Sequence, residues 1–103
     1  MIEVVKSATF DRWLRRLKDQ RAAARVQVRI DRLASGNPGD VKPVGRGVSE
    51  LRIDYGPGYR VYYLQDGQQL IVLLCGGSKS GQDRDIEAAQ RLADEWRSHG
   101  RQG

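Results

Sequence analysis

The chain has 103 residues, with 18 Lys and Arg against 13 Asp and Glu, a net charge of +5 and an isoelectric point near 9.8. This length supports one modest hydrophobic core, and the positive charge favours an anionic partner such as nucleic acid or an acidic protein. A single cysteine excludes a disulfide framework, and the lack of a leader pattern or of an apolar run near the ~20 residues that span a bilayer predicts a cytoplasmic protein without a membrane partner.

The first part of the chain predicts a short strand followed by two helices. Residues 2–5 are charged or β-branched, and Ser7 or Thr9 offers a side-chain oxygen to cap the next helix. That helix has apolar side chains at helical spacing: Phe10, Trp13, Leu14 and Leu17. Asp19 can cap a second helix, with apolar positions at Ala23, Val26, Ile30 and Leu33. The run Gly36-Asn37-Pro38-Gly39 ends it, so we expect a helical hairpin.

Residues 50–75 predict three strands joined by hairpins, because the pattern changes there from helical spacing to alternation. One face carries Leu51, Ile53 and Tyr55, and the opposite face carries Glu50, Arg52 and Asp54. The run Gly56-Pro57-Gly58 makes a turn into a strand at 59–64, and Asp66-Gly67 is a hairpin signal before a more buried strand at 70–75. Cys75 ends this apolar strand, and we expect its thiol to lie in the core.

A last helix completes the predicted domain. Ser80 and Asp83 are spaced as a capping box ahead of the apolar positions Ile86, Ala89, Leu92, Ala93 and Trp96. Residues 98–103 are expected to form a frayed tail, and the glycine pairs at 45 and 47 and at 76 and 77 to serve tight backbone turns. The order β-α-α-β-β-β-α predicts a single α+β domain over residues 1–103.

Three sequence blocks occur in the order found in a known family: Val48-Ser49-Glu50-Leu51-Arg52-Ile53, Gly58-Tyr59-Arg60-Val61-Tyr62-Tyr63 and Leu73-Leu74-Cys75-Gly76-Gly77-Ser78-Lys79-Ser80. With the element order, these blocks make the chain resemble the RelE/ParE toxin superfamily over nearly its whole length. The runs at 36–42 and 82–86 look like its HigB-like branch, the addiction-module killer proteins. The resemblance implies a four-stranded antiparallel sheet, with residues 2–5 as the fourth strand and the helical hairpin on one side.

The resemblance also implies a function and partners. RelE and HigB branches are toxins of type II toxin–antitoxin modules that cut messenger RNA on the ribosome without a metal or other cofactor, whereas ParE branches poison DNA gyrase. All are neutralised by a cognate antitoxin, here expected to be a helix-turn-helix HigA-like protein that also carries the complex to operator DNA. We therefore expect a metal-independent, ribosome-dependent endoribonuclease. A gyrase inhibitor and a catalytically degenerate module that only binds antitoxin are the alternatives.

Cutting RNA without a metal needs cations around the scissile phosphate and groups that move protons. Alternation places Arg52 and Arg60 on one sheet face, where their guanidinium groups could clamp the phosphate. They could equally be solvated strand residues paired with Glu50 or Asp54. Lys79 follows the third strand, where the RelE pattern also keeps a basic residue. It is the candidate proton donor or transition-state cation, with an ordinary surface lysine as the alternative.

The proton-transfer residues are less well defined. The RelE pattern places a tyrosine in the last helix, but no aromatic residue lies between residues 80 and 95 of this chain. Asp83 is a candidate base or simply a helix cap, and Glu50 is an alternative base or a salt-bridge partner of Arg52. His99, the one histidine, lies in the predicted tail and is expected to be incidental.

Three further residues are candidates for RNA binding. Lys42 and Arg46 lie in the loop before the sheet, and alternation puts Tyr62 beside Arg60, where its ring could stack on a base. The first two helices also carry a basic face that is either solvated or follows RNA phosphates. Its residues are Arg12, Arg15, Arg16, Arg21, Arg25 and Arg29.

Overall fold

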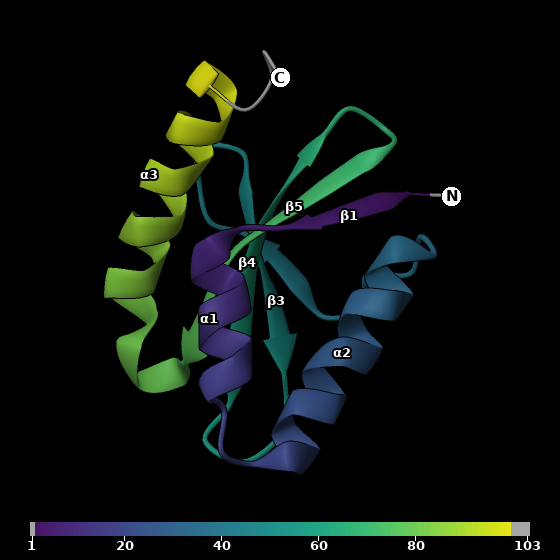
Figure 1. The fold of residues 1–103 in the computed structure, drawn as a ribbon, viewed down its shortest axis with the longest axis vertical. Coiled ribbons are helices and arrows are strands. Elements are labelled where there is room, and N and C mark those ends of the chain that lie inside the picture. The colour runs from purple at the N-terminus through teal and green to yellow at the C-terminus, as the bar shows by residue number, and fades with distance from the viewer. Residues whose placement is uncertain (1, 100–103) are drawn as a thin grey trace.

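The computed structural model describes residues 2–99, which form a sheet with helices on both faces (Figure 1). In chain order the elements are β1 (Glu3–Lys6), α1 (Ala8–Arg16), α2 (Gln20–Ala34), β2 (Val41–Pro43), β3 (Val48–Ile53), β4 (Tyr59–Asp66), β5 (Leu70–Ser78), a 3-10 turn (Lys79–Gly81) and α3 (Gln82–His99). None of these helices is long and apolar enough to cross a membrane. The predicted α+β class, the helical hairpin and the three hairpin-linked strands are confirmed.

The sheet has five strands in the order β1-β5-β4-β3-β2, one more than predicted. The additional strand, β2, has three residues including Pro43, and it pairs with β3 at the sheet edge, where a proline is tolerated. β1 pairs with β5 in parallel, whereas the other pairs are antiparallel, so the sheet is mixed and not, as the resemblance implied, antiparallel throughout. A parallel pair needs a long connection between its strands, and the helical hairpin with the intervening strands supplies it.

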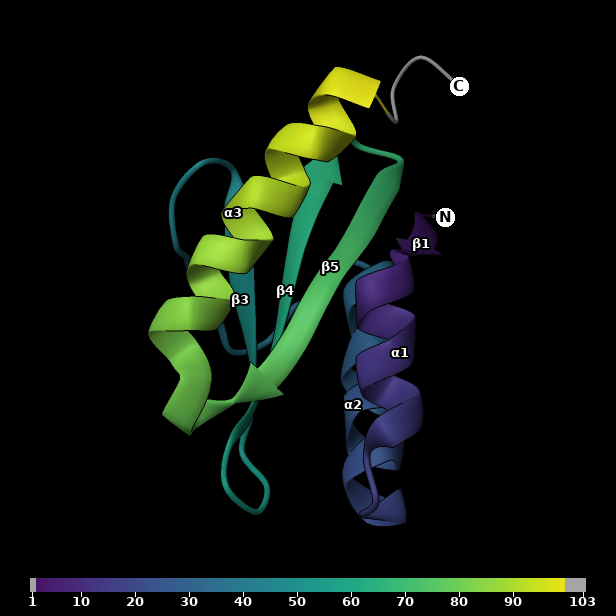
Figure 2. The same cartoon turned by 60° about the vertical axis from the view of Figure 1, so that its left-hand side comes forward.

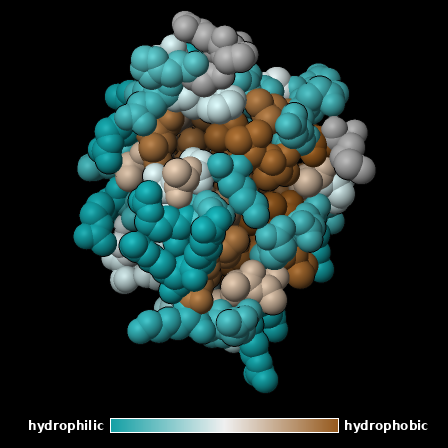
Figure 3. Space-filling view, viewed as in Figure 1, coloured by the Kyte–Doolittle hydropathy of each residue, from teal (hydrophilic) through white to brown (hydrophobic). Residues whose placement is uncertain are grey.

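Helices cover both faces of the sheet, α1 and α2 on one side and α3 on the other (Figure 2). The core on the α1–α2 side includes Phe10, Val26, Ile30, Leu51 and Val61. The core on the α3 side includes Val48, Tyr62, Leu64, Leu74, Ala89 and Ala93. Figure 3 shows apolar residues between the helices, whose outward faces are hydrophilic. Because α3 covers the second face, polar residues of β3 and β4 on that face lie under a helix instead of facing solvent.

The helix ends follow the sequence signals at three places and differ at both ends of α3. Ser80, the predicted cap of α3, lies in the 3-10 turn before this helix, and its hydroxyl is hydrogen-bonded to the Ser78 hydroxyl at 2.9 Å. The Ser7 hydroxyl accepts a hydrogen bond from the Phe10 N–H, and the Asp19 carboxylate accepts one from the Arg21 N–H, each at 2.9 Å. α2 ends at Ala34, just before the glycine-proline run. α3 continues to His99, so residues 98 and 99 are helical, since no glycine or proline comes earlier to end the helix. The rest of the predicted tail, residues 100–103, lies outside the described residues.

The glycine pair Gly76 and Gly77 lies inside β5 and does not form the turn that we expected. Gly76 is needed because the Trp13 ring of α1 lies against the strand there, whereas Gly77 on the opposite face meets the end of the Asp85 side chain. A Cβ atom on Gly76 would stand 2.4 Å from the Trp13 ring of α1, and one on Gly77 would stand 2.0 Å from a carboxylate oxygen of Asp85 on α3. Gly76 therefore sets how near α1 lies to β5.

Replacing Gly76 with alanine is expected to destabilise the fold by about 1–3 kcal/mol, because the added methyl group overlaps the Trp13 ring. The Trp13 ring packs against Phe10 and Tyr59, with centroid distances of 5.8 and 6.3 Å, so it cannot move aside freely. Chemical denaturation measures the loss. In a Trp13→Leu background the Gly76→Ala change should cost less, because the smaller side chain leaves room. Equal costs in both backgrounds would show that the two residues do not interact.

Candidate active site

A buried carboxylate, Glu50, organises the polar residues between β3, β4 and α3. Its side chain is fully buried, and it is the one buried charged residue among residues 2–99. Glu50 Oε1 accepts a hydrogen bond from Arg52 Nε at 3.0 Å. Oε2 accepts one from the Tyr62 hydroxyl at 3.2 Å and one from Gln82 Nε2 at 2.7 Å. Glu50 thus ties both strands to the first residue of α3.

Arg60 lies beside this carboxylate with its guanidinium group largely enclosed. The side chain is 12% exposed, and its Nε is 3.8 Å from Glu50 Oε1. Nη1 donates to the Tyr59 carbonyl at 3.1 Å, whereas the buried Nε has no hydrogen-bond partner within the described residues. A buried donor without an acceptor is costly. The negative charge of Glu50 is therefore the main interaction that offsets the burial of Arg60.

Arg52, Arg60 and Lys79, the three predicted catalytic residues, line one cleft of about 370 Å³. Arg52 and Arg60 stand directly opposite each other in the register of β3 and β4. The Lys79 N–H donates to the Gly58 carbonyl at 2.7 Å, which fixes the end of β5 against the β3–β4 turn. Gly58 has a φ of +81°, a value that favours glycine. The cleft therefore gathers three positive charges from three separate segments.

Two carboxylates that we did not select from the sequence line the same cleft, Asp40 and Asp54. The Asp40 carbonyl accepts a hydrogen bond from the Arg52 N–H at 3.0 Å, so Asp40 extends the cross-strand row of Arg52 and Arg60. Both aspartates are exposed, and neither forms an ion pair within residues 2–99. Alternation did place Asp54 on the face of Arg52. No signal marked Asp40, because it is positioned by β2, which we did not predict.

The predicted acid–base candidates do not face the cleft as free carboxylates. Glu50 is enclosed and both of its oxygens accept hydrogen bonds, so it is the salt-bridge partner of Arg52 and not a base that RNA can reach. Asp83 is exposed in the first turn of α3, where it lines a different cavity of about 430 Å³ that also includes Lys79. It is the second residue of α3, where its negative charge suits the N-terminal end of the helix. His99 lies at the opposite end of α3.

The predicted RNA-binding residues do not gather around the cleft either. Tyr62 is fully buried, because α3 covers a face that we expected to be open, so its ring cannot stack on a base. Burial, followed by the charge of Glu50, raises the pKa of the Tyr62 hydroxyl, which therefore stays protonated as a donor. Arg46 forms an ion pair with Asp94 of α3 at 2.9 Å. Lys42 is exposed on the edge strand β2, opposite Glu50 in the register.

Cys75 is buried, as predicted, and its thiol donates a hydrogen bond to the Asp85 carbonyl at 3.6 Å. Burial, with a smaller contribution from the charge of Asp85, raises the pKa of the thiol to about 12. Because the thiolate is the nucleophilic form, Cys75 is expected to resist iodoacetamide at about pH 8 in the folded protein and to react in guanidinium chloride. Mass spectrometry after a timed reaction measures this difference. Rapid labelling of the native protein would contradict it.

The chain is similar to known proteins along most of its length. The model of the family described as phage derived protein Gp49-like (DUF891) matches residues 12–95, a span that contains every residue lining the cleft. A protein of Haemophilus influenzae, described as uncharacterized, is 52% identical over 94 residues, which cover 91% of this chain and 95% of that protein.

Proposed function

Because the chain belongs to the Gp49-like family of phage-derived proteins (DUF891), we propose that it is the toxin of a type II toxin–antitoxin module and that it cleaves messenger RNA on the ribosome. Support comes from the resemblance of its sequence blocks to RelE and HigB toxins and from the cleft between β3, β4 and the end of β5, where three cations meet beside two aspartates. The net charge of +5 also suits an RNA target.

The observation that carries this proposal is the convergence of Arg52, Arg60 and Lys79 on one cleft. A phosphodiester there meets guanidinium groups that bind phosphate oxygens in pairs and stay charged at any working pH. The transition state of the cleavage carries more negative charge at phosphorus than the substrate does, so fixed cations stabilise it preferentially. Glu50 holds both arginines in position before RNA binds, which makes it a positioning residue.

In the proposed reaction the ribose 2′-oxygen attacks the adjacent phosphorus in line with the departing 5′-oxygen. Asp40 accepts the proton of the 2′-hydroxyl, the bond between the 2′-oxygen and phosphorus forms, and the bond between phosphorus and the 5′-oxygen breaks. Lys79 donates a proton to the 5′-oxygen, and the products are a 2′,3′-cyclic phosphate and a 5′-hydroxyl. Asp40 suits the base because it is exposed and adjoins Arg52 at the β2 end of the cleft, whereas Lys79 follows β5.

Inducible expression of the chain alone in a bacterial host tests this function, with growth followed together with the mapping of new 5′ ends in total RNA. Growth arrest with cuts inside translated messages, bearing 5′-hydroxyl ends, is the expected result. Arrest without cuts would favour gyrase inhibition, and a DNA-damage response would then be expected. Unaffected growth would favour a degenerate module that only binds antitoxin.

The proposed partner is a small helix-turn-helix antitoxin whose acidic side chains complement the basic surface of this chain. The antitoxin is expected to block the cleft and to connect the complex to operator DNA, so that the toxin contacts DNA only indirectly. Copurification with the small protein encoded beside its gene tests the partnership, and the absence of a complex would contradict it.

A further inference from the structure

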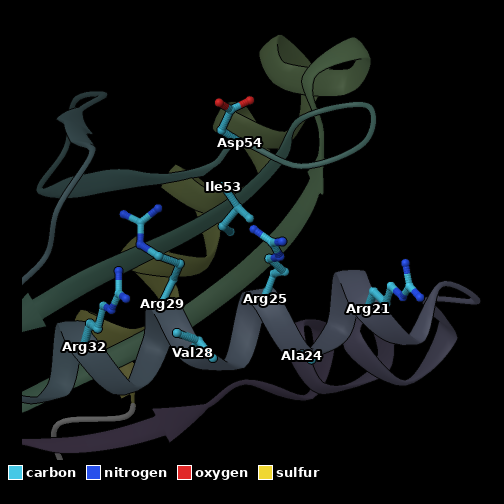
Figure 4. Close-up of a pocket in the computed structure, with 8 residues that line it drawn as sticks. All are labelled: Arg21, Ala24, Arg25, Val28, Arg29, Arg32, Ile53 and Asp54. Atoms are coloured by element: carbon cyan, nitrogen blue, oxygen red, sulfur yellow. The ribbon is translucent and has the colours of Figure 1, made fainter.

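A second groove, which adjoins the candidate active site, runs along α2 and is lined by arginines and by apolar residues (Figure 4). Its volume is about 720 Å³, nearly twice that of the first cleft. Asp54 lines both, so the two meet beside the β3–β4 turn. The arginines are Arg21, Arg25, Arg29 and Arg32, and the apolar lining consists of Ala24 and Val28 of α2 and Ile53 of β3. We call these residues the α2 groove.

Two of the four arginines are engaged within the fold. Arg29 donates hydrogen bonds to the carbonyls of Arg52 and Pro38, so it holds α2 against the start and end of the β2–β3 segment. Arg25 lies over the Tyr55 ring, with its Cζ 5.1 Å from the ring centroid. Figure 4 shows both side chains rising from the middle of α2 toward the strand that carries Ile53.

The other two arginines are available to a partner. Arg21 and Arg32 are exposed, and neither forms an ion pair within the described part of the chain. They mark the two ends of the groove in Figure 4. They are eleven positions apart in α2, which places their backbones about 16 Å apart along the helix axis. The free positive charges therefore stand at both ends of the groove.

Between these charges, α2 exposes apolar residues beside Arg25 and Arg29. Val28 is 49% exposed, and it is the one large hydrophobic residue left exposed among residues 2–99. Ala24, one helical turn earlier, is also exposed, while the buried Ile53 forms part of the wall. Exposed apolar residues with an unpaired cation at each end complement a peptide that has apolar side chains along one face and carboxylates near its ends.

RNA fits this surface less well than such a peptide does. Sites for single-stranded RNA usually combine cations with aromatic rings on which bases stack. The ring of Tyr55 is covered by Arg25, and its hydroxyl donates to Asp19 at 3.2 Å. The observations therefore favour a protein partner in the α2 groove.

We propose that the α2 groove binds an acidic amphipathic segment of a partner protein, with apolar side chains against Val28 and carboxylates on Arg21 and Arg32. A helical segment that spans both arginines has about 11 residues. Only the identification of this partner as the antitoxin rests on the proposed function. Because the groove meets the candidate active site at Asp54, a segment bound there is placed to hinder the entry of RNA.

Selection from a displayed library of random peptides of about 14 residues, on the purified wild-type protein, tests the proposal. We expect the retained peptides to combine Asp or Glu with apolar residues at helical spacing. A retained peptide, titrated in solution, should bind at least tenfold more weakly to Val28→Glu and to the double variant Arg21→Glu/Arg32→Glu. The double variant Arg12→Glu/Arg16→Glu on α1 makes the same charge change at exposed residues and should keep the affinity within about twofold.

Retained peptides without acidic residues, or equal binding to wild type and Val28→Glu, would overturn the proposal. Competition for the groove by a single-stranded RNA of mixed sequence, lost in the Arg21→Glu/Arg32→Glu variant, would assign the groove to RNA instead. Growth arrest on expression of the chain alone tests the proposed nuclease, whereas peptide binding tests the groove. A harmless chain that binds the acidic peptide contradicts the nuclease alone, and a toxic chain that retains no such peptide contradicts the groove alone.

Discussion

Glu50→Ala is expected to lower the free energy of unfolding by about 3–5 kcal/mol, the loss typical of removing one member of a buried ion pair. The change leaves the donors of Arg52, Arg60, Tyr62 and Gln82 around an empty space. Arg60 is affected most, because its side chain is 12% exposed and its charge would no longer face a carboxylate. Thermal unfolding should show a fall in Tm of more than about 10 °C.

Two further variants distinguish the effect of the buried charge on stability from the effect of removing any glutamate. Glu50→Gln keeps the side-chain volume and one acceptor oxygen, so its loss should be smaller than that of Glu50→Ala. Glu87→Ala removes an exposed glutamate from α3 and is expected to change the stability by less than about 0.5 kcal/mol. If Glu50→Ala unfolds within about 1 kcal/mol of the wild type, Glu50 does not organise the residues around it.

The elements of the fold were predictable because their signals are local. Ser7 and Asp19 cap helices through hydrogen bonds that reach no further than the next three residues. The strands β3 and β4, which pair in the structure, are predicted by the alternation of apolar and polar residues and by the glycine-rich turn between them. The parallel pairing of β1 with β5 has no local signal, because it joins segments from the two ends of the domain. β2 was missed because three residues are too few to show any pattern.

The candidate site was predictable only in part, for a related reason. Alternation predicts that Arg52 and Arg60 share a face of the sheet, and the register of β3 and β4 confirms this prediction. Alternation does not predict which element covers that face. We expected Glu50 and Tyr62 to face solvent, whereas α3, formed by residues that follow all the strands, buries both of them. The apolar positions of the last helix needed a second core, and this requirement was the available signal.

The arrangement of charge in the site also follows from this second core. Two arginines held by a carboxylate in open solvent would be positioned only loosely, because exposed ion pairs contribute little to stability. Under α3, Glu50 accepts a hydrogen bond from Arg52 and balances the charge of Arg60, so the arginines are positioned without closing the outer side of the cleft. The remaining cation, Lys79, is exposed and is anchored through its backbone. It is thus the cation whose removal disturbs the fold least.

Lys79→Ala is therefore expected to reduce the rate of RNA cleavage by at least about 100-fold, the lower end of what a positioned acid or base contributes, while Tm changes little. The stability should hold because Lys79 is joined to Gly58 through its N–H, which the substitution keeps. The rate is measured with the purified protein on a message under translation. Lys18→Ala, which removes an exposed lysine from the α1–α2 connection, is the matched control and should retain the wild-type rate.

Lys79→Arg distinguishes a proton donor from a fixed cation. An arginine at this position keeps the positive charge but does not release its proton at working pH. If Lys79 protonates the 5′-oxygen, the Arg variant should bind RNA as the wild type does and cleave it nearly as slowly as the Ala variant. Restoration of the rate by arginine would assign Lys79 to charge stabilisation at the phosphate. A Lys79→Ala protein that cleaves at the wild-type rate would remove the residue from the reaction altogether, and with it the convergence of three cations on which the proposed nuclease depends.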